Sequence, residues 1–187
     1  MRKIIPFILL AFLAAAFVSS CEKDEQSTWD KYRDWREANN AWLTAMSAKT
    51  NPDGTPYYTR IVPEWNPGSF VLIHYFNDRS ETEGNLSPLY TSTVDTRYYL
   101  RLYDDTPVDS SYANTDPAPG VFRTRLNTVI QGWSAALCNM RCGDTAEVVI
   151  PYGVAYGASD YGTIKPYSNL RFNIRLLDIP YYEASPY

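Results

Sequence analysis

The residue types that most often catalyse reactions are scarce in this chain of 187 residues. Its one histidine, His74, stands within an apolar run, where a structural role is the more common one. Cys138 and Cys142, with a single distant histidine, cannot complete a zinc site. No serine stands in a nucleophile elbow, no loop has a phosphate-binding glycine pattern, and Asp104 and Asp105 lie in a turn-like stretch. The sequence therefore gives little support to hydrolysis by a nucleophile or a metal, and it predicts no cofactor.

Rotation about a prolyl peptide bond is one reaction that needs none of these groups. Its barrier comes from amide resonance and is about 18–20 kcal/mol. An enzyme lowers this barrier if it binds the twisted amide more tightly than the planar one. The twisted amide has a less polar carbonyl, so an apolar cleft that excludes water favours it. A millionfold acceleration requires the activation free energy to fall by about 8 kcal/mol. A cleft lined by aromatic side chains can supply a reduction of this size.

Five short motifs follow one another between Tyr98 and Ile179. They are Asp109-Ser110-Ser111, Val129-Ile130-Gln131-Gly132-Trp133, Met140-Arg141-Cys142-Gly143-Asp144, Ile150-Pro151 with Ala155-Tyr156-Gly157, and Ile164-Lys165-Pro166 with the strand that starts at Asn169. Each motif alone is weak, but their order and spacing resemble the FKBP-type peptidyl-prolyl isomerase family. The resemblance implies prolyl isomerase activity and an α+β fold, in which an FKBP-like antiparallel half-barrel sheet wraps around one short helix.

The same resemblance implies a role for each residue of the binding pocket. Trp133 would form the floor beneath the proline ring, because a large rigid indole offers a broad apolar surface. The walls would come from Tyr98, Phe122, Val129, Ile164 and Phe172. The backbone N–H of Ile130 and the hydroxyl of Tyr156 would donate to ligand carbonyls, and Asp109 would orient the site through hydrogen bonds. The alternative is that Trp133, Phe122 and Phe172 are ordinary core residues.

Several positions depart from the family pattern. Val108 stands where the family usually has phenylalanine, and the loop 111–120 shows no evident arginine partner for Asp109. The stretch 77–90 looks like an insertion. These changes motivate a second hypothesis, a peptide-binding chaperone that retains the pocket without useful turnover. A third hypothesis is a carbohydrate-binding protein that uses the 16 tyrosines of the chain.

The elements that must position this pocket follow from alternating and helical patterns. Alternation of apolar and polar residues predicts strands at 69–76, 93–102, 122–126, 146–150 and 170–177. One short helix is expected over 133–140, ended near Gly143.

A longer helix is predicted near the N-terminus, over residues 27–49. Ser27 can cap it, and an aromatic stripe with helical spacing follows, formed by Trp29, Tyr32, Trp35, Ala38, Trp42 and Leu43. The turn residues of 51–56 end it. This N-terminal helical extension would pack on the following domain or, alternatively, bind a partner.

The first residues predict export. Arg2 and Lys3 precede an apolar run that is too short to span a membrane as a helix, and Val18-Ser19-Ser20-Cys21 resembles a bacterial lipobox. We expect a lipoprotein signal peptide at 1–20 and acylation of Cys21, although an ordinary cleaved signal is the alternative. The acidic residues of 22–25 would be a solvated spacer or a signal for export to the cell surface.

These patterns divide the chain into a signal peptide (1–20), an anchor with spacer and helix (21–56), an FKBP-like domain (57–180) and a tail (181–187). We expect a lipid-anchored protein of the cell envelope, at the outer membrane, facing the periplasm or the surface. Its partners would be proline-containing exported polypeptides and, by resemblance, a macrolide ligand.

A net charge of −4 argues against nucleic acid as a binding partner. The oligomeric state is open. Cys138 and Cys142 could form a disulfide, but buried thiols are favoured.

Overall fold

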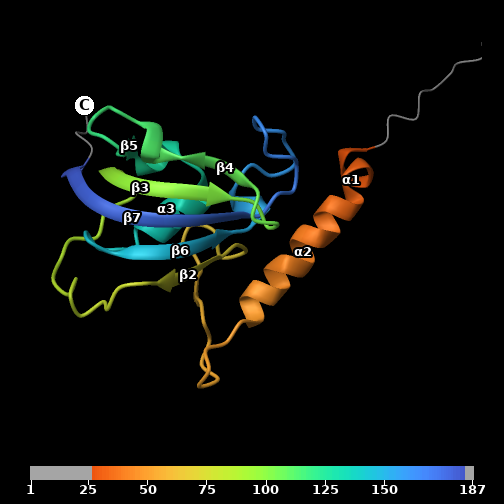
Figure 1. Ribbon diagram of the computed structural model, residues 1–187, viewed down its shortest axis with the longest axis horizontal. Coiled ribbons are helices and arrows are strands. Elements are labelled where there is room, and N and C mark those ends of the chain that lie inside the picture. Colours follow the sequence, from red (N-terminus) through yellow and green to blue (C-terminus); the bar gives the residue numbers. More distant parts are fainter. Residues whose placement is uncertain (1–26, 184–187) are drawn as a thin grey trace, which may run out of the picture.

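The computed structural model describes residues 27–183 (Figure 1). The expected signal peptide, the expected lipidation site Cys21 and the acidic cluster 22–25 lie outside the described residues, as does most of the tail. Within 27–183, no helix combines the length and the apolar character that a membrane crossing requires.

Seven antiparallel strands form one sheet in the order β1-β2-β6-β7-β3-β4, with β5 paired to β3 beyond this path (Figure 1). The strands are β1 (Thr59–Ile61), β2 (Val71–Tyr75), β3 (Thr93–Arg101), β4 (Pro107–Ser110), β5 (Phe122–Arg125), β6 (Thr145–Ile150) and β7 (Leu170–Tyr181). All five predicted strands are present within a few residues of their predicted bounds. The short edge strands β1 and β4 were not predicted.

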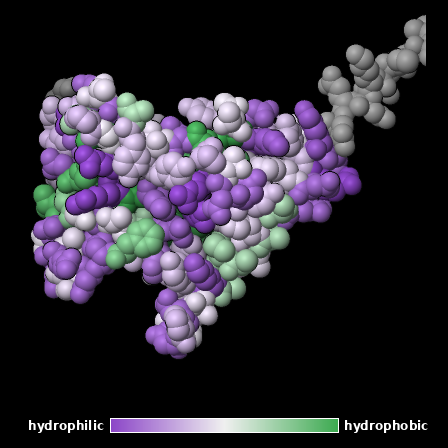
Figure 2. Space-filling view, in the orientation of Figure 1, coloured by the Kyte–Doolittle hydropathy of each residue, from purple (hydrophilic) through white to green (hydrophobic). Residues whose placement is uncertain are grey.

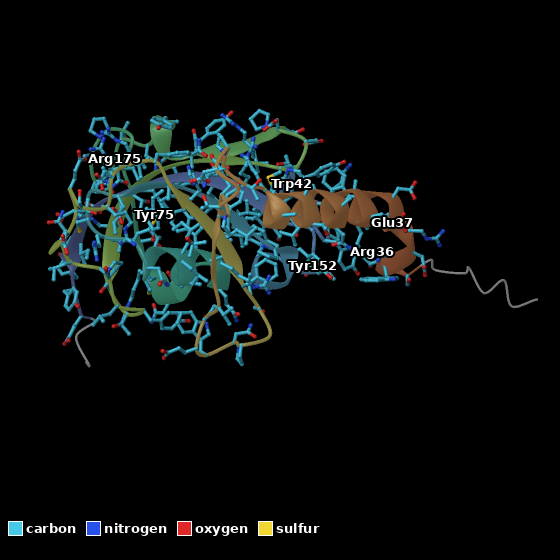
Figure 3. The ribbon with its side chains drawn as sticks, turned by 90° about the horizontal axis from the view of Figure 1, so that it is seen from below. Arg36, Glu37, Trp42, Tyr75, Tyr152 and Arg175 are labelled. Carbon is cyan, nitrogen blue, oxygen red and sulfur yellow. The ribbon has the colours of Figure 1, made fainter. Side chains whose placement is uncertain are left out.

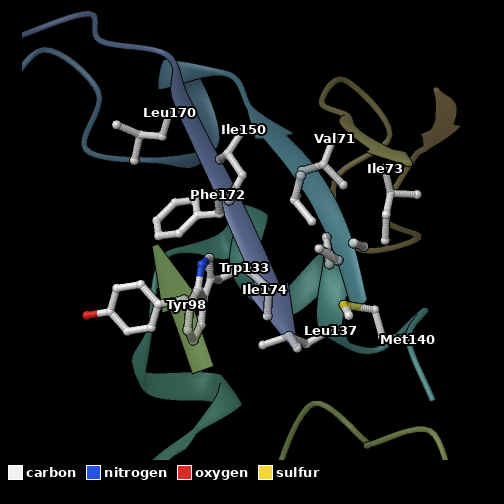
Figure 4. Packing of buried hydrophobic residues seen from close by; sticks show 14 of the residues in the cluster. Val71, Ile73, Tyr98, Trp133, Leu137, Met140, Ile150, Leu170, Phe172 and Ile174 are labelled. Carbon is white, nitrogen blue, oxygen red and sulfur yellow. The ribbon is translucent and has the colours of Figure 1, made fainter. Parts of the chain in front are cut away.

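The predicted short helix is α3 (Gln131–Leu137), which lies against the inner face of the sheet (Figure 1). Every residue from Gly132 to Leu137 is buried. Gly132 allows this close packing, because a Cβ atom at this position would lie 2.2 Å from Cγ2 of Ile150 on β6. The main core is formed by α3 and the inner faces of β2, β6, β7 and β3 (Figure 4). The predicted α+β fold is confirmed.

The N-terminal extension consists of α1 (Thr28–Lys31) and α2 (Arg33–Ala48), separated by a break at Tyr32. Ser27 caps α1 as predicted, with its hydroxyl oxygen accepting the N–H of Asp30 at 3.2 Å. The C-terminal half of α2 packs on the outer face of the sheet, where Trp42, Leu43 and Met46 contact a small second core of Tyr58, Leu72 and Val149. The extension therefore belongs to the folded domain (Figure 3). The surface seen in Figure 2 is mostly hydrophilic or neutral, with scattered apolar groups.

The inserted stretch 77–90 is held by a buried carboxylate, that of Asp144. Its oxygens accept hydrogen bonds from the Thr82 hydroxyl at 2.7 Å, the Asn77 amide at 3.1 Å and the Arg141 backbone N–H at 2.8 Å. Arg79 adds an ion pair at 3.3 Å. A buried charge is tolerated only when it is paired in this way, so the insertion is an integral part of the fold.

Cys138 and Cys142 are both free thiols and both partly buried. Burial raises the pKa of the Cys138 thiol to about 11 and also raises the pKa of Cys142. Both thiols are therefore protonated at neutral pH. This agrees with the interpretation of both cysteines as small, partly buried apolar residues.

The close contact of α3 with β6 predicts the effect of one substitution. Gly132→Ala forces the new methyl group into Ile150, and overpacking of this kind costs about 1–3 kcal/mol of unfolding free energy. Urea unfolding measures this loss. Gly153→Ala is the matched control, because a Cβ atom there meets nothing within 4 Å. Equal stability of the two variants would contradict the packing described here.

Candidate active site

A cavity of about 540 Å³ opens between α3, the inner face of the sheet and the loops at one end of the strands. It is lined by Tyr98, Leu100, Asp109, Phe122, Thr124, Thr128, Val129, Ile130, Trp133, Tyr156, Tyr161 and Phe172. Apolar and aromatic side chains make up most of this lining, and a few polar groups converge on it. This is the usual composition of a small-ligand site.

Four aromatic rings form the base of the cavity, and Trp133 lies at their centre. Its ring centroid is 5.3 Å from that of Tyr98, 5.5 Å from Phe172 and 5.9 Å from Phe122, all in edge-to-face geometry. Trp133 and Phe172 are both almost fully buried, and Figure 4 shows them packed beside Tyr98. Edge-to-face contacts of this kind fix ring orientation, so the base is rigid before any ligand arrives.

The wall at β3 and β4 carries a hydrogen-bonded pair, Tyr98 and Asp109. The Tyr98 hydroxyl donates to Oδ2 of Asp109 at 2.5 Å, and Oδ1 accepts the N–H of Ser110 at 2.7 Å. Burial raises the pKa of Tyr98 well above its usual value, and the hydrogen bond to Asp109 adds to this effect. The phenol therefore stays neutral at physiological pH, and Asp109 orients the wall by accepting hydrogen bonds.

Ser111 fixes the loop that follows Asp109. Its hydroxyl accepts the backbone N–H of Tyr98 at 3.0 Å and donates to the carbonyl of Gly120 at 2.8 Å. Both bonds are buried. The loop 111–120 is thereby closed onto β3 beside the cavity, although it contains no arginine.

Ile130 lies at the entrance of α3, as its N-cap residue. The first N–H groups of a helix have no partner within the helix. The Ile130 N–H makes no hydrogen bond to another part of residues 27–183. Since Ile130 also lines the cavity, its N–H is available to a ligand carbonyl.

Two tyrosines form the opposite rim. The rings of Tyr156 and Tyr161 stack with centroids 4.2 Å apart and planes 11° apart. Burial raises the pKa of Tyr156, and the nearby Tyr161 and Asp109 raise it further. Its hydroxyl is therefore a neutral donor across the cavity from Trp133.

Comparison with known proteins identifies this arrangement. Residues 85–177 match the family model described as FKBP-type peptidyl-prolyl cis-trans isomerase. This region of the chain belongs to the FKBP family. The macrophage infectivity potentiator of Trypanosoma cruzi is 40% identical over 97 residues, which are 51% of this chain and 47% of that protein. The FKBP-type 22 kDa peptidyl-prolyl cis-trans isomerase of Escherichia coli is 40% identical over 93 residues, or 49% and 43% of the two chains.

Solved structures show the same fold. A peptidyl-prolyl cis-trans isomerase from Pseudomonas syringae superposes with a TM-score of 0.58 and 28% identity, over 76% of this chain and 93% of that one. FkpA from Escherichia coli gives a TM-score of 0.62 at 24% identity, over 81% and 64% of the two chains. The matching part of this chain spans less than half the length of the curated relatives named above.

The structure brings together eight of the nine residues that the sequence predicts for the FKBP pocket. Tyr98, Asp109, Phe122, Val129, Ile130, Trp133, Tyr156 and Phe172 all line one cavity. Ile164 does not line it. It is buried in the main core, and its backbone pairs with Tyr161 in an isolated bridge. Tyr161, the partner of Ile164 in this bridge, lines the cavity, whereas Ile164, which was expected to form part of a wall, does not.

The remaining lining residues escaped the sequence analysis for identifiable reasons. Leu100 and Thr124 lie two positions after Tyr98 and Phe122, so strand alternation would have found them. Tyr161 is 59% exposed in a loop, where no periodicity applies. Val108, which stands where the family usually has phenylalanine, packs against the main core and is not among the lining residues.

The burial of Tyr98 predicts a pH effect on stability. The folded state favours the neutral phenol, so the unfolded chain ionises first as the pH rises through about 10. The free energy of unfolding should therefore fall with pH above this value, and it should fall less steeply in Tyr98→Phe. Urea unfolding at a series of alkaline pH values measures both slopes. Identical slopes would show that Tyr98 ionises as freely in the folded protein as in the unfolded one.

Proposed function

We propose that this protein is a peptidyl-prolyl cis-trans isomerase acting on X-Pro bonds of polypeptides. The observation that carries the proposal is the rigid aromatic base at Trp133, faced by three neutral hydrogen-bonding groups. These are the Ile130 N–H and the hydroxyls of Tyr156 and Tyr98. Membership in the FKBP family supports the same reaction.

The reaction follows from the shape and polarity of the cavity. Water stabilises the planar amide more than the twisted one, because the planar form is more polar. An apolar pocket around a proline ring on Trp133 removes this preference for the planar form. The Ile130 N–H and the Tyr156 hydroxyl would hold carbonyl oxygens on either side of the rotating bond. No proton is transferred, so no group with a pKa near neutrality is needed. Tight binding of the twisted amide relative to the planar ground state lowers the barrier.

Tyr156→Phe tests the polar part of this site. Loss of a hydrogen bond to the bound peptide costs about 0.5–1.5 kcal/mol, which is a fall of roughly twofold to thirteenfold in kcat/KM. The assay follows refolding of a substrate whose slow phase is limited by proline isomerisation, with a macrolide as inhibitor control. Tyr181→Phe removes a hydroxyl at the far end of β7, where the ring is 64% exposed, and should leave the rate unchanged.

Trp133→Ala tests the floor. Removal of the indole should abolish most of the acceleration, and circular dichroism must show that the variant is folded, since large-to-small core changes cost about 3–5 kcal/mol. Absence of catalysis by the folded wild-type chain at micromolar concentration would rule out the isomerase. If the chain then bound proline peptides and suppressed aggregation, it would be the peptide-binding chaperone that the Val108 substitution suggested.

We also propose that the protein works in the cell envelope, held there by acyl groups on Cys21. The proposal rests on the basic start, the apolar run and the Val18-Ser19-Ser20-Cys21 sequence. Few residues separate Cys21 from Ser27, the first residue that the structure describes, so the domain would lie close to the membrane surface. Its substrates would then be exported polypeptides.

Cys21→Ala tests this anchor. The variant should move from the membrane fraction to the soluble fraction when cells are separated, because acyl chains would be the attachment. Metabolic labelling with a fatty acid should mark the wild-type chain and not the variant. Unchanged fractionation of the variant would contradict a lipid anchor at this position.

A further inference from the structure

Helix α2 contacts the loop that carries one rim of the candidate active site. This β6–β7 loop, residues 151–169, joins the two central strands and contains Tyr156 and Tyr161. It lies at the end of the sheet that faces α1 and α2 (Figure 1). Both helices precede residues 85–177, the part that matches the family model. Their contacts with the loop are therefore an addition to the matched domain.

The central contact joins Asn39 of α2 to Asn169 at the end of the loop. Both side chains have no exposed surface. The Asn169 N–H donates to Oδ1 of Asn39 at 2.8 Å, and the Asn169 side-chain amide donates to the Asn39 carbonyl at 2.7 Å. The Asn39 amide itself donates to the carbonyl of Trp35 at 2.9 Å. Burial of polar groups is costly unless all of them are paired, and a paired network of this kind fixes one geometry.

Three further contacts join the N-terminal helices to the same segment. Trp35 Nε1 donates to Oγ of Ser168 at 3.0 Å, and the Lys165 ammonium lies 4.5 Å from the centre of a Trp35 ring. Trp29 packs edge-to-face on Tyr167, with ring centroids 5.3 Å apart. Two residues of the predicted aromatic stripe, Trp29 and Trp35, therefore contact this loop.

Hydrogen bonds continue from these contacts into the loop and reach the cavity rim. Oδ1 of Asn169 accepts the N–H of Tyr152 at 2.9 Å, so Asn169 ties the two ends of the loop together; Figure 3 shows Tyr152 beside α2. The N–H of Tyr167 donates to the carbonyl of Gly157 at 2.8 Å. Gly157 follows Tyr156 directly. A short path therefore connects Asn39 with Tyr156, through the hydrogen bond to Asn169 and the hydrogen bond from Tyr167 to Gly157.

Apolar packing alone would be enough to dock the helix, because Trp42, Leu43 and Met46 already attach its other end to the sheet. The buried asparagine pair adds a position-specific link at the loop end. A long loop without such support samples many conformations, and misplacement of a binding group by about 1 Å can cost a factor of a hundred in rate.

We infer that α2 is a positioning element of the candidate active site, in which Asn39 holds the β6–β7 loop so that Tyr156 and Tyr161 face Trp133. Asn39 touches no ligand and acts through Asn169. The predicted effect of Asn39 on the reaction rate rests on the proposed isomerase function. The predicted effect of Asn39 on the loop does not depend on that function.

Asn39→Ala in the full chain tests the link, since it leaves the buried N–H of Asn169 without an acceptor. Hydrogen exchange of the Tyr167 and Ile164 amides should become about tenfold faster, equivalent to about 1.4 kcal/mol. The kcat/KM for a proline peptide should fall by about the same factor, mainly through a higher KM, because Tyr156 is displaced from the bound peptide.

Two variants make this test specific. Trp42→Ala on the same helix removes packing against the outer face of the sheet, and it should leave loop exchange and KM within about twofold of the wild type. Trp35→Phe deletes the N–H donated to Ser168 and makes the ring beside Lys165 smaller, but it keeps an aromatic ring at this position. This variant should raise the loop exchange rate and KM as Asn39→Ala does, but by a smaller factor. It replaces Asn39→Ala as the test if Asn39→Ala does not fold.

The outcomes separate the two proposals. Unchanged loop exchange in folded Asn39→Ala or Trp35→Phe, or equal acceleration in Trp42→Ala, would overturn the positioning role. If the wild-type chain shows no isomerase activity, the proposed function fails, yet faster loop exchange in the variant would still support the link between α2 and the loop.

Discussion

The close packing of α3 on the Ile150 side chain of β6, at Gly132, determines where the indole of Trp133 lies. A Cβ atom at residue 132 would collide with Ile150, so the helix reaches its depth only because this residue is glycine. Trp133 follows directly and meets the rings of Tyr98 and Phe172 at the base of the cavity. The same placement puts Ile130, whose N–H has no hydrogen-bond partner within residues 27–183, in the cavity lining. The floor and one donor of the pocket thus depend on a single packing contact.

The chemistry that such a pocket supports is set by polarity rather than by proton transfer. Burial keeps the phenols of Tyr98 and Tyr156 neutral, so both remain donors over the physiological pH range. Asp109 is fully engaged as an acceptor from Tyr98 and Ser110. A site built in this way can bind an amide and exclude water around it. It has no nucleophile and no general base, and rotation about a prolyl bond requires neither.

Much of this arrangement could be predicted from the sequence, because local patterns determine it. The period-2 strands and the motif around Trp133 predicted the sheet, α3 and most of the cavity lining. The three-residue β1 was too short and too exposed to give a pattern, and β4 begins at Pro107, which lowers its strand propensity. The absence of Ile164 from the cavity lining has a similar origin, since sequence order in a loop does not say which side chain faces the cavity.

The contacts between α2 and the β6–β7 loop had no detectable sequence pattern. Asn39 and Asn169 are 130 residues apart, and a polar residue within a helix normally predicts an exposed face. Only the folded chain shows that this asparagine is buried and paired. The N-terminal helix, for which partner binding was the alternative to packing on the domain, has its aromatic face largely occupied within the chain.

The central claim is that a proline residue binds on Trp133 and isomerises there. Two-dimensional exchange NMR of a peptide with one X-Pro bond, mixed with a small amount of the full chain, tests it most directly. The account predicts cis–trans exchange peaks at mixing times too short for the free peptide, together with upfield shifts of the proline ring protons from the indole. Shifts without exchange peaks would show that the pocket binds proline without catalysis, and the absence of both would contradict the account.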